Sequence, residues 1–278
     1  MAYLTVHGVT PAAQARIAAR AGYDFVSFRL CPLGVPGEPD CDPIAPEALR
    51  ETKRALRETG LSVLDIELAR IVRDRDPESY LPVMEAAAEL GARYLISSAW
   101  TTDRDDGRFI IERYGEICDL AREFGMTVDL EFPTFSRLRS LADAIDVVRA
   151  AARPNGGVLV DALYYHFSSC TPADLATLPA GWVHFLHLCD TAQRIPATER
   201  EQIRLAREAR LYVGEGCIDL GALTAALPAV PLSIELPNAR RSAELGHDGH
   251  AQRCIETARA YFRQLDAPVR LRRTVTAE

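Results

Sequence analysis

Eight short apolar runs recur along the 278-residue chain, and helical segments lie between them. The runs are rich in β-branched residues and occupy residues 3–7, 24–30, 62–66, 94–97, 127–131, 157–161, 183–188 and 232–235. Near-continuous apolar runs of this length are typical of strands that are buried on both faces. The helical patterns occupy residues 11–21, 46–59, 77–90, 111–124, 138–152 and 239–265, with a short helix from Pro172. Strands that alternate with helices predict right-handed βαβ units and a parallel sheet.

Eight such units predict an α/β fold, a single (β/α)8 barrel. A barrel of this kind uses about 250 residues as one domain, so the chain length does not require a second one. The residues after the first run, HGVT at 7–10, lack the GxGxxG turn of an open dinucleotide-binding sheet. We therefore expect one barrel domain over residues 1–268 and a frayed tail at residues 269–278. Two long loops, at residues 31–46 and 190–216, are expected to cover the pocket.

Charge, hydropathy and cysteine usage narrow the functional classes. The formal net charge of −7 argues against a nucleic-acid-binding surface. No stretch approaches the roughly 18 apolar residues of a transmembrane helix, and the N-terminus shows no signal-peptide pattern. The seven cysteines are scattered without a CxxC pair, which predicts reduced thiols and a cytoplasmic protein, although Cys31 and Cys41 share a loop and could in principle bridge.

Polar residues close four consecutive runs. Glu131, Asp161 and Glu235 end the fifth, sixth and eighth runs, and His187 lies near the end of the seventh. Because the C-terminal ends of barrel strands form one face, these side chains should converge. Three carboxylates and one imidazole suit Mn²⁺ or Mg²⁺, with Co²⁺ and Zn²⁺ also possible. Each residue alone could be an ordinary cap or a satisfied core histidine, but four strand ends in a row favour a metal site.

Five stretches of the chain carry a family resemblance, at residues 130–151, 158–179, 185–191, 213–220 and 232–238. They resemble the sugar phosphate isomerase/epimerase family, whose fold is the xylose isomerase-like TIM barrel. The resemblance implies one divalent metal held by Glu131, Asp161, His187 and Glu235. In ketose epimerases of this type the two metal-binding glutamates also shuttle protons on opposite faces of the substrate, which implies the same role for Glu131 and Glu235. Tyr164 stands where better-known members often have the histidine of an Asp-x-x-His pattern, which indicates altered substrate recognition.

Further polar and aromatic residues are candidates for substrate binding. Arg210 resembles the family arginine that reaches substrate oxygens, or it is a solvated surface arginine. His166 contacts substrate or caps the helix that starts at Pro172. Three residues at other strand ends are expected to face the same pocket: Arg29, Glu67 and Trp100. Glu67 could instead cap a helix, and Trp100 could form either a wall for a sugar ring or a lid. Asp190 is expected to orient His187 or its loop.

The leading prediction is a metal-dependent isomerase or epimerase of a sugar or keto-polyol. It would abstract a proton next to a metal-bound carbonyl and pass through an enediolate. A lyase is the main alternative, either a dehydratase of a keto-inositol or dehydroshikimate type or an enzyme that eliminates the aglycone of a 3-keto glycoside. The first half-reaction is shared, so the sequence hardly separates these reactions.

Two classes of non-isomerase function remain as weaker alternatives. An endonuclease-IV-like nuclease would need three zinc ions and more histidines than the six present. A non-catalytic barrel subunit would have no need of the four converging side chains. We expect a small-molecule substrate, no nucleic-acid or membrane partner, and a homo-oligomer.

Overall fold

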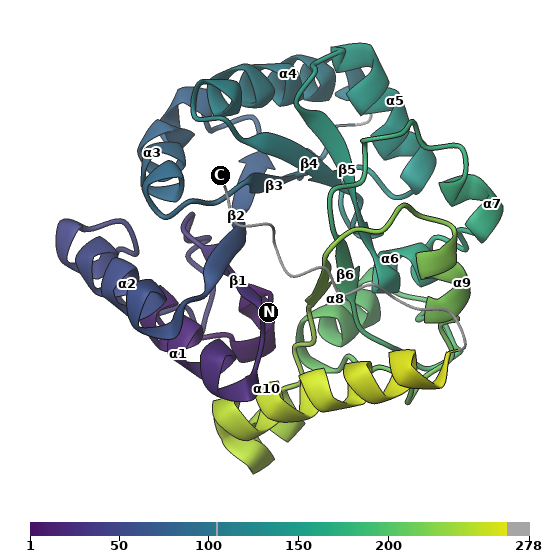
Figure 1. Ribbon diagram of the computed structural model, residues 1–278. Helices are drawn as coiled ribbons and strands as arrows, with labels where there is room; N and C mark the ends of the chain where they lie inside the picture. The colour runs from purple at the N-terminus through teal and green to yellow at the C-terminus, as the bar shows by residue number, and fades with distance from the viewer. Residues whose placement is uncertain (104, 266–278) are drawn as a thin grey trace.

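Seven parallel strands form one sheet in sequential order, and helices surround it (Figure 1). The computed structural model describes residues 1–103 and 105–265. The strands are β1 (Phe25–Arg29), β2 (Ser62–Ile71), β3 (Tyr94–Ala99), β4 (Thr127–Glu131), β5 (Gly156–Asp161), β6 (Leu186–Leu188) and β7 (Leu232–Ile234). The curvature of the sheet and its outer ring of helices are those of a xylose isomerase-like TIM barrel, as predicted.

Ten α-helices and two 3₁₀ helices connect and cover the strands within the described residues. The α-helices are α1 (Pro11–Ala21), α2 (Pro46–Thr59), α3 (Leu81–Glu89), α4 (Gly107–Glu123), α5 (Leu141–Ala151), α6 (Ala162–Phe167), α7 (Pro172–Leu175), α8 (Glu199–Glu208), α9 (Leu220–Ala225) and α10 (Ala239–Gln264). The 3₁₀ helices are η1 (Tyr3–Val6) and η2 (Pro77–Tyr80). None of the helices described is long and apolar enough to cross a membrane.

The helix boundaries follow local signals in the sequence. Thr10 caps α1 by accepting a hydrogen bond from the Ala13 amide at 3.3 Å, and Pro11 fills the first helical position. Gly60 ends α2 in the left-handed conformation, with φ of 70°. The helix expected over residues 77–90 is divided into η2 and α3. The predicted loop at residues 190–216 contains a helix, α8, that the sequence analysis missed.

The strand predicted at residues 3–7 is wrong, because residues 3–6 form η1. The preceding backbone still bridges the two edges of the sheet: Met1 O accepts from Ser27 N of β1, and Ala2 N donates to Ile234 O of β7. The chain then turns, and beyond this point the side chain of Thr5, rather than the backbone, makes the hydrogen bonds to the edge of β7. Thr5 Oγ1 donates to Ile234 O at 2.8 Å and accepts from Leu236 N at 3.1 Å. The N-terminal segment therefore occupies the gap between β7 and β1, where the strand predicted at residues 3–7 would have closed the barrel.

The apolar core is divided between the two sides of the sheet. A large cluster fills the layer between the strands and the helices. A smaller cluster includes Leu159 and Phe185, which lie two residues before Asp161 and His187 and so share their face of the sheet. Its members are Phe25, Leu64, Leu68, Ile96, Leu159 and Phe185. This cluster inside the barrel supports the polar groups at the C-terminal ends of the strands.

All seven cysteines are free, so Cys31 and Cys41 do not form a disulfide here. The predicted tail at residues 269–278 and the last residues of the predicted domain, 266–268, lie outside the described residues.

Candidate active site

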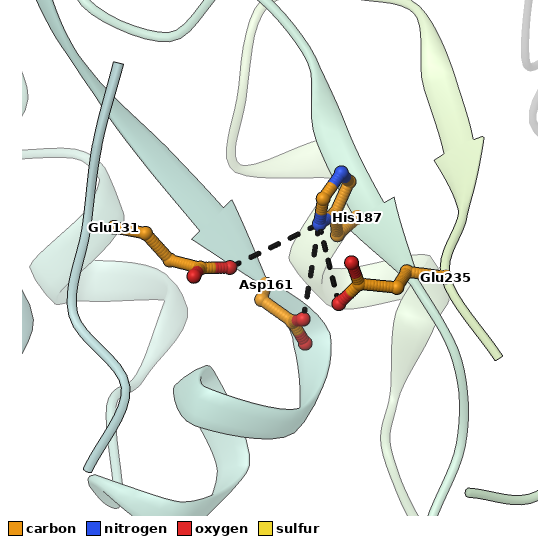
Figure 2. Close-up of side chains that lie close together, drawn as sticks. All are labelled: Glu131, Asp161, His187 and Glu235. Atoms are coloured by element: carbon orange, nitrogen blue, oxygen red, sulfur yellow. Dashed lines mark ion pairs between the residues drawn. The ribbon is translucent and has the colours of Figure 1, made fainter. Parts of the chain in front are cut away.

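The four strand-end residues meet at one point (Figure 2). Glu131 ends β4, Asp161 ends β5, His187 lies in β6, and Glu235 directly follows β7. The His187 Nδ1 atom is 3.9 Å from Glu131 Oε1, 3.9 Å from Asp161 Oδ2 and 3.5 Å from Glu235 Oε2. One potential ligand atom from each residue lies within 4.8 Å of all the others. The sequence therefore predicted the convergence of these side chains correctly.

These groups are buried and incompletely paired. The Glu131 side chain is only 12% exposed, and the other three are more deeply buried. Neither ring nitrogen of His187 has a hydrogen-bond partner. Three buried carboxylates around an imidazole that makes no hydrogen bond leave excess negative charge and unsatisfied polar atoms, which a bound cation would balance. The oxygen-rich donor set and its close spacing fit a divalent metal ion.

The pKa values in the cluster diverge. Burial raises the pKa of Glu131 well above its usual value, and the neighbouring Glu235 and Asp161 carboxylates raise it further. Burial also acts to raise the pKa of Glu235, but His187 and Arg210 outweigh it and hold that pKa below its usual value. Burial acts to lower the pKa of His187, but the Glu235 and Asp161 carboxylates raise it to about 10. Carboxyl groups with such different environments can play different roles in proton transfer.

Arg210 is fully buried behind two of the carboxylates. Its Nη1 lies 2.7 Å from Asp161 Oδ2, and its Nη2 lies 2.8 Å from Glu235 Oε2. Its Nε donates to Ala206 O at 2.9 Å, which fixes the plane of the guanidinium. Arg210 was expected to reach substrate oxygens or to be exposed on the surface. The structure instead places it outside the cavity lining, where it pairs with Asp161 and Glu235.

The polar cluster forms the floor of a cavity of about 450 Å³. Glu131, His187 and Glu235 line this cavity. The loop at residues 31–46 and the helix α8 contribute to its walls, which confirms that the two long connections cover the pocket. A cavity of this size is ample for a small organic substrate.

The predicted pocket residues Arg29, Glu67 and Trp100 all line the cavity. Arg29 Nη2 is 2.8 Å from Glu67 Oε2, and Arg29 Nη1 is 3.2 Å from Glu38 Oε1. The Glu67–Leu68 peptide bond is cis, and Leu68 lines the cavity as well. The charge of Arg29 is thus already matched by two carboxylates.

Glu38 holds the covering loop in place. Its carboxylate accepts hydrogen bonds from the amides of Leu33, Gly34 and Val35 in addition to its contact with Arg29. Burial acts to raise the pKa of Glu38, but the Leu33 amide and Arg29 lower it below its usual value. The wall formed by this loop is therefore preorganised.

His166 lies away from the cavity, contrary to one of its two expected placements. It is half-buried on α6, and its Nε2 is 3.8 Å from Cys217 Sγ. Asp190 orders the loop, one of the two roles considered for it. Its carboxylate accepts from the amides of Thr191, Gly214, Gly216 and Ile218 at 2.9–3.1 Å.

Two aromatic residues, Phe135 and Tyr164, also line the cavity; the sequence had linked Tyr164 to altered substrate recognition, but no pattern pointed to Phe135. Tyr164 lies in α6, three residues after Asp161, and that spacing is the one that marked it in the sequence. The two rings contact each other edge to face, with centroids 5.6 Å apart. They give the cavity an apolar side opposite its charged floor.

Comparison with known proteins identifies the family. The sequence profile of the xylose isomerase-like TIM barrel family matches residues 15–264. The chain belongs to this family. Among curated relatives of the family, the inosose isomerase of Bacillus velezensis is 23% identical over 228 residues, which are 75% of each chain. The Bacillus subtilis inosose isomerase is 24% identical over 158 residues, covering 54% of this chain and 55% of that one.

Solved structures agree with the fold. The structure of the IolI protein with a bound zinc atom has a TM-score of 0.77 and 18% identity, and the match covers 96% of this chain and 99% of that one. The D-allulose 3-epimerase of a Methylomonas species, solved with D-allulose, has a TM-score of 0.68 and 18% identity, over 94% and 95% of the two chains. At these identities the likeness shows a shared barrel.

Proposed function

We propose that this protein is a divalent-metal-dependent isomerase or epimerase of a sugar or keto-polyol. The observation that carries the proposal is the buried cluster of three carboxylates and one imidazole on the cavity floor. The similarity to inosose isomerases, and to the fold of a ketose epimerase, supports the same reaction class.

Glu131, Asp161, His187 and Glu235 would hold the ion, with Mn²⁺ or Mg²⁺ favoured by the oxygen-rich donors. Zn²⁺ and Co²⁺ are compatible with the same set, and the similar IolI structure contains zinc. When bound, a divalent cation supplies Lewis acidity that makes the proton next to a substrate carbonyl easier to remove. Among the described residues this is the single cluster suited to a shared cation, so the three-zinc endonuclease alternative finds no support there.

The chain's own residues would move the proton. Glu131 and Glu235 extend from different strands into the cavity, so they can reach a substrate carbon from two sides. Glu131 would act as the base, because it lines the cavity and does not share the ion pairs that Arg210 makes with Asp161 and Glu235. Glu235 would exchange the proton on the other face. Trp100 and Tyr164 would pack against the carbon skeleton and exclude water.

Proton exchange in deuterated water tests this proposal. The protein is first analysed for bound metal and then incubated with a panel of keto-inositols and ketoses. We expect deuterium incorporation at one carbon next to the carbonyl, with recovery of an isomer or epimer. If the true substrate turns over without exchange and without a primary isotope effect at that carbon, the proposal is wrong. Exchange accompanied by loss of water or of an aglycone would show that the protein is a lyase instead.

Metal binding should release protons at pH 7. His187, with a pKa of about 10, is protonated at this pH in the metal-free protein, and a ligand must lose its proton to bind. Metal affinity should therefore increase as the pH rises toward 10. Calorimetric titration of Mn²⁺ in two buffers of different ionisation enthalpy measures the released protons. A heat that is independent of the buffer would contradict this expectation.

We also propose a homo-oligomer, for which sedimentation velocity is the direct measurement. A monomer at all concentrations would overturn this point and leave the metal site unaffected.

A further inference from the structure

Arg70 is a cation without an acidic partner that lies beside the cavity, against the cavity-lining Trp100. Arg70 follows Leu68 by two residues in β2, so the alternation of the strand turns both side chains to the inside of the barrel. Its guanidinium carbon lies 5.1 Å from the ring centroid of Trp100, which lines the cavity. Within residues 1–103 and 105–265, no carboxylate lies within 4.0 Å of its nitrogens. Its Nε is buried and makes no hydrogen bond.

The surroundings of Arg70 are unfavourable for an unpaired cation. Arg70 is half-buried, and burial lowers its pKa below the usual value. Tyr80 and Asp74 act to raise this pKa, whereas the nearby cations Arg75 and Arg207 act to lower it. Other arginines of the region have partners. Arg29 contacts two carboxylates, and Arg73 pairs with Asp106. A desolvated guanidinium left without an anion indicates that a ligand supplies one.

A second arginine, Arg207, faces the same space from α8. Arg207 lines the cavity, is exposed, and has no ion-pair partner in the described part of the chain. It lies close enough to Arg70 and to His7 to influence both electrostatically. Helix α8 also brings Glu208 to the wall, so the mouth is not uniformly basic. We call Arg70 and Arg207 the rim arginines.

We propose that the substrate carries an anionic group, a carboxylate or a phosphate, that the rim arginines bind while its hydroxyketone end lies at the Glu131–Glu235 floor. This inference rests on the proposed function, because it describes the other end of the same ligand. Arg29 is unsuited to the task, because Glu67 and Glu38 already match its charge. The stacking of Arg70 on Trp100 holds the guanidinium in place before the ligand arrives, so less conformational entropy is lost on binding.

Three ketoses with six-carbon skeletons test the inference: neutral D-fructose, D-fructose 6-phosphate and the carboxylate 5-keto-D-gluconate. Their affinities for the Mn²⁺-reconstituted protein are measured by calorimetry at low salt. We expect at least one of the two anions to bind roughly tenfold more tightly than D-fructose, as a charge-assisted contact provides. The preferred anion identifies the group as phosphate or carboxylate. Equal affinity for all three ketoses would overturn the inference.

Substitutions show which residues cause the tighter binding of the anionic ketoses. Arg70→Met and Arg207→Met should each remove most of the anionic advantage and leave D-fructose binding unchanged, whereas Arg70→Lys should retain part of it. Arg204→Met is the matched control, because Arg204 is exposed on the same helix and does not line the cavity. An anionic advantage that survives in both Met variants would also overturn the inference. If the protein prefers the anionic ketoses but exchanges no substrate proton, the proposed isomerase or epimerase reaction is wrong, while the role of the rim arginines in binding an anion is upheld.

Discussion

Glu131→Gln and Glu235→Gln should each lower turnover by at least the roughly 10²–10⁴-fold that general base catalysis contributes. Glutamine keeps the shape of the side chain and one oxygen, but it cannot accept a proton from carbon. Both carboxylates face the cavity. Of the other nearby acids in the described part of the chain, Asp161 is bound by Arg210 and by the amide of Leu163, and Glu67 is paired with Arg29. Solvent exchange of the substrate α-proton should fall in parallel with turnover.

The control for this result separates chemistry from metal loss. Metal content is measured for each variant, and rates are compared at saturating Mn²⁺. Glu208→Gln is a matched variant, since Glu208 lines the cavity without belonging to the cluster, and it should retain turnover. Full activity of both Gln variants at saturating metal would show that neither glutamate is the base.

Arg210→Met should destabilise the metal-free protein by about 3–5 kcal/mol, the cost of leaving a buried ion pair with one partner missing. Arg210 contacts both Asp161 and Glu235 at 2.7–2.8 Å, and none of these side chains is exposed enough for water to replace it. The loss should be largest in the presence of a chelator and smaller when Mn²⁺ supplies the missing positive charge. Urea denaturation monitored by circular dichroism measures both values.

A second substitution distinguishes this electrostatic role from simple packing. Adding Asp161→Asn to Arg210→Met removes one of the uncompensated charges, so the double variant should recover part of the lost stability. An Arg210→Met protein as stable as the wild type in chelator would contradict the role inferred for Arg210. A change confined to KM, with unchanged stability and metal affinity, would point back to direct substrate contact.

The strand-end residues could be predicted because one rule links sequence to space. In a parallel barrel the C-terminal ends of all the strands lie at the same face, so an acid at the end of a buried apolar run is expected at that face. Glu131, Asp161, His187 and Glu235 follow that rule, and so does Arg29. Glu67 also lines the cavity, but β2 continues past it to Ile71. No knowledge of the loops was required for any of them.

The positions of loop residues could not be obtained in this way. Arg210 lies in a connection whose path depends on α8 and on the four amides that Asp190 holds nearby. Whether its guanidinium enters the cavity or passes behind the carboxylates is decided by that path. His166 is similar, because α6 is short and its orientation depends on packing. The strand prediction for the first apolar run failed for another reason. Its β-branched residues suit a strand, but the run forms a 3₁₀ helix, and the Thr5 hydroxyl makes the hydrogen bonds to the backbone at the edge of β7.

That contact of Thr5 has a consequence for how the site comes into being. Its hydroxyl holds Ile234 O and Leu236 N, the backbone groups on either side of Glu235, across more than 220 positions of sequence. β7 pairs with β6, and Glu235 N donates to Leu188 O, so the Thr5 contact completes the placement of Glu235 when the beginning and the end of the barrel meet. Glu131 and Asp161 lie on strands that pair with each other. Contacts between such distant segments carry the largest loop-closure cost and form late in folding. If Glu131 and Glu235 act as proposed, the site gains its full order only in the event that closes the barrel.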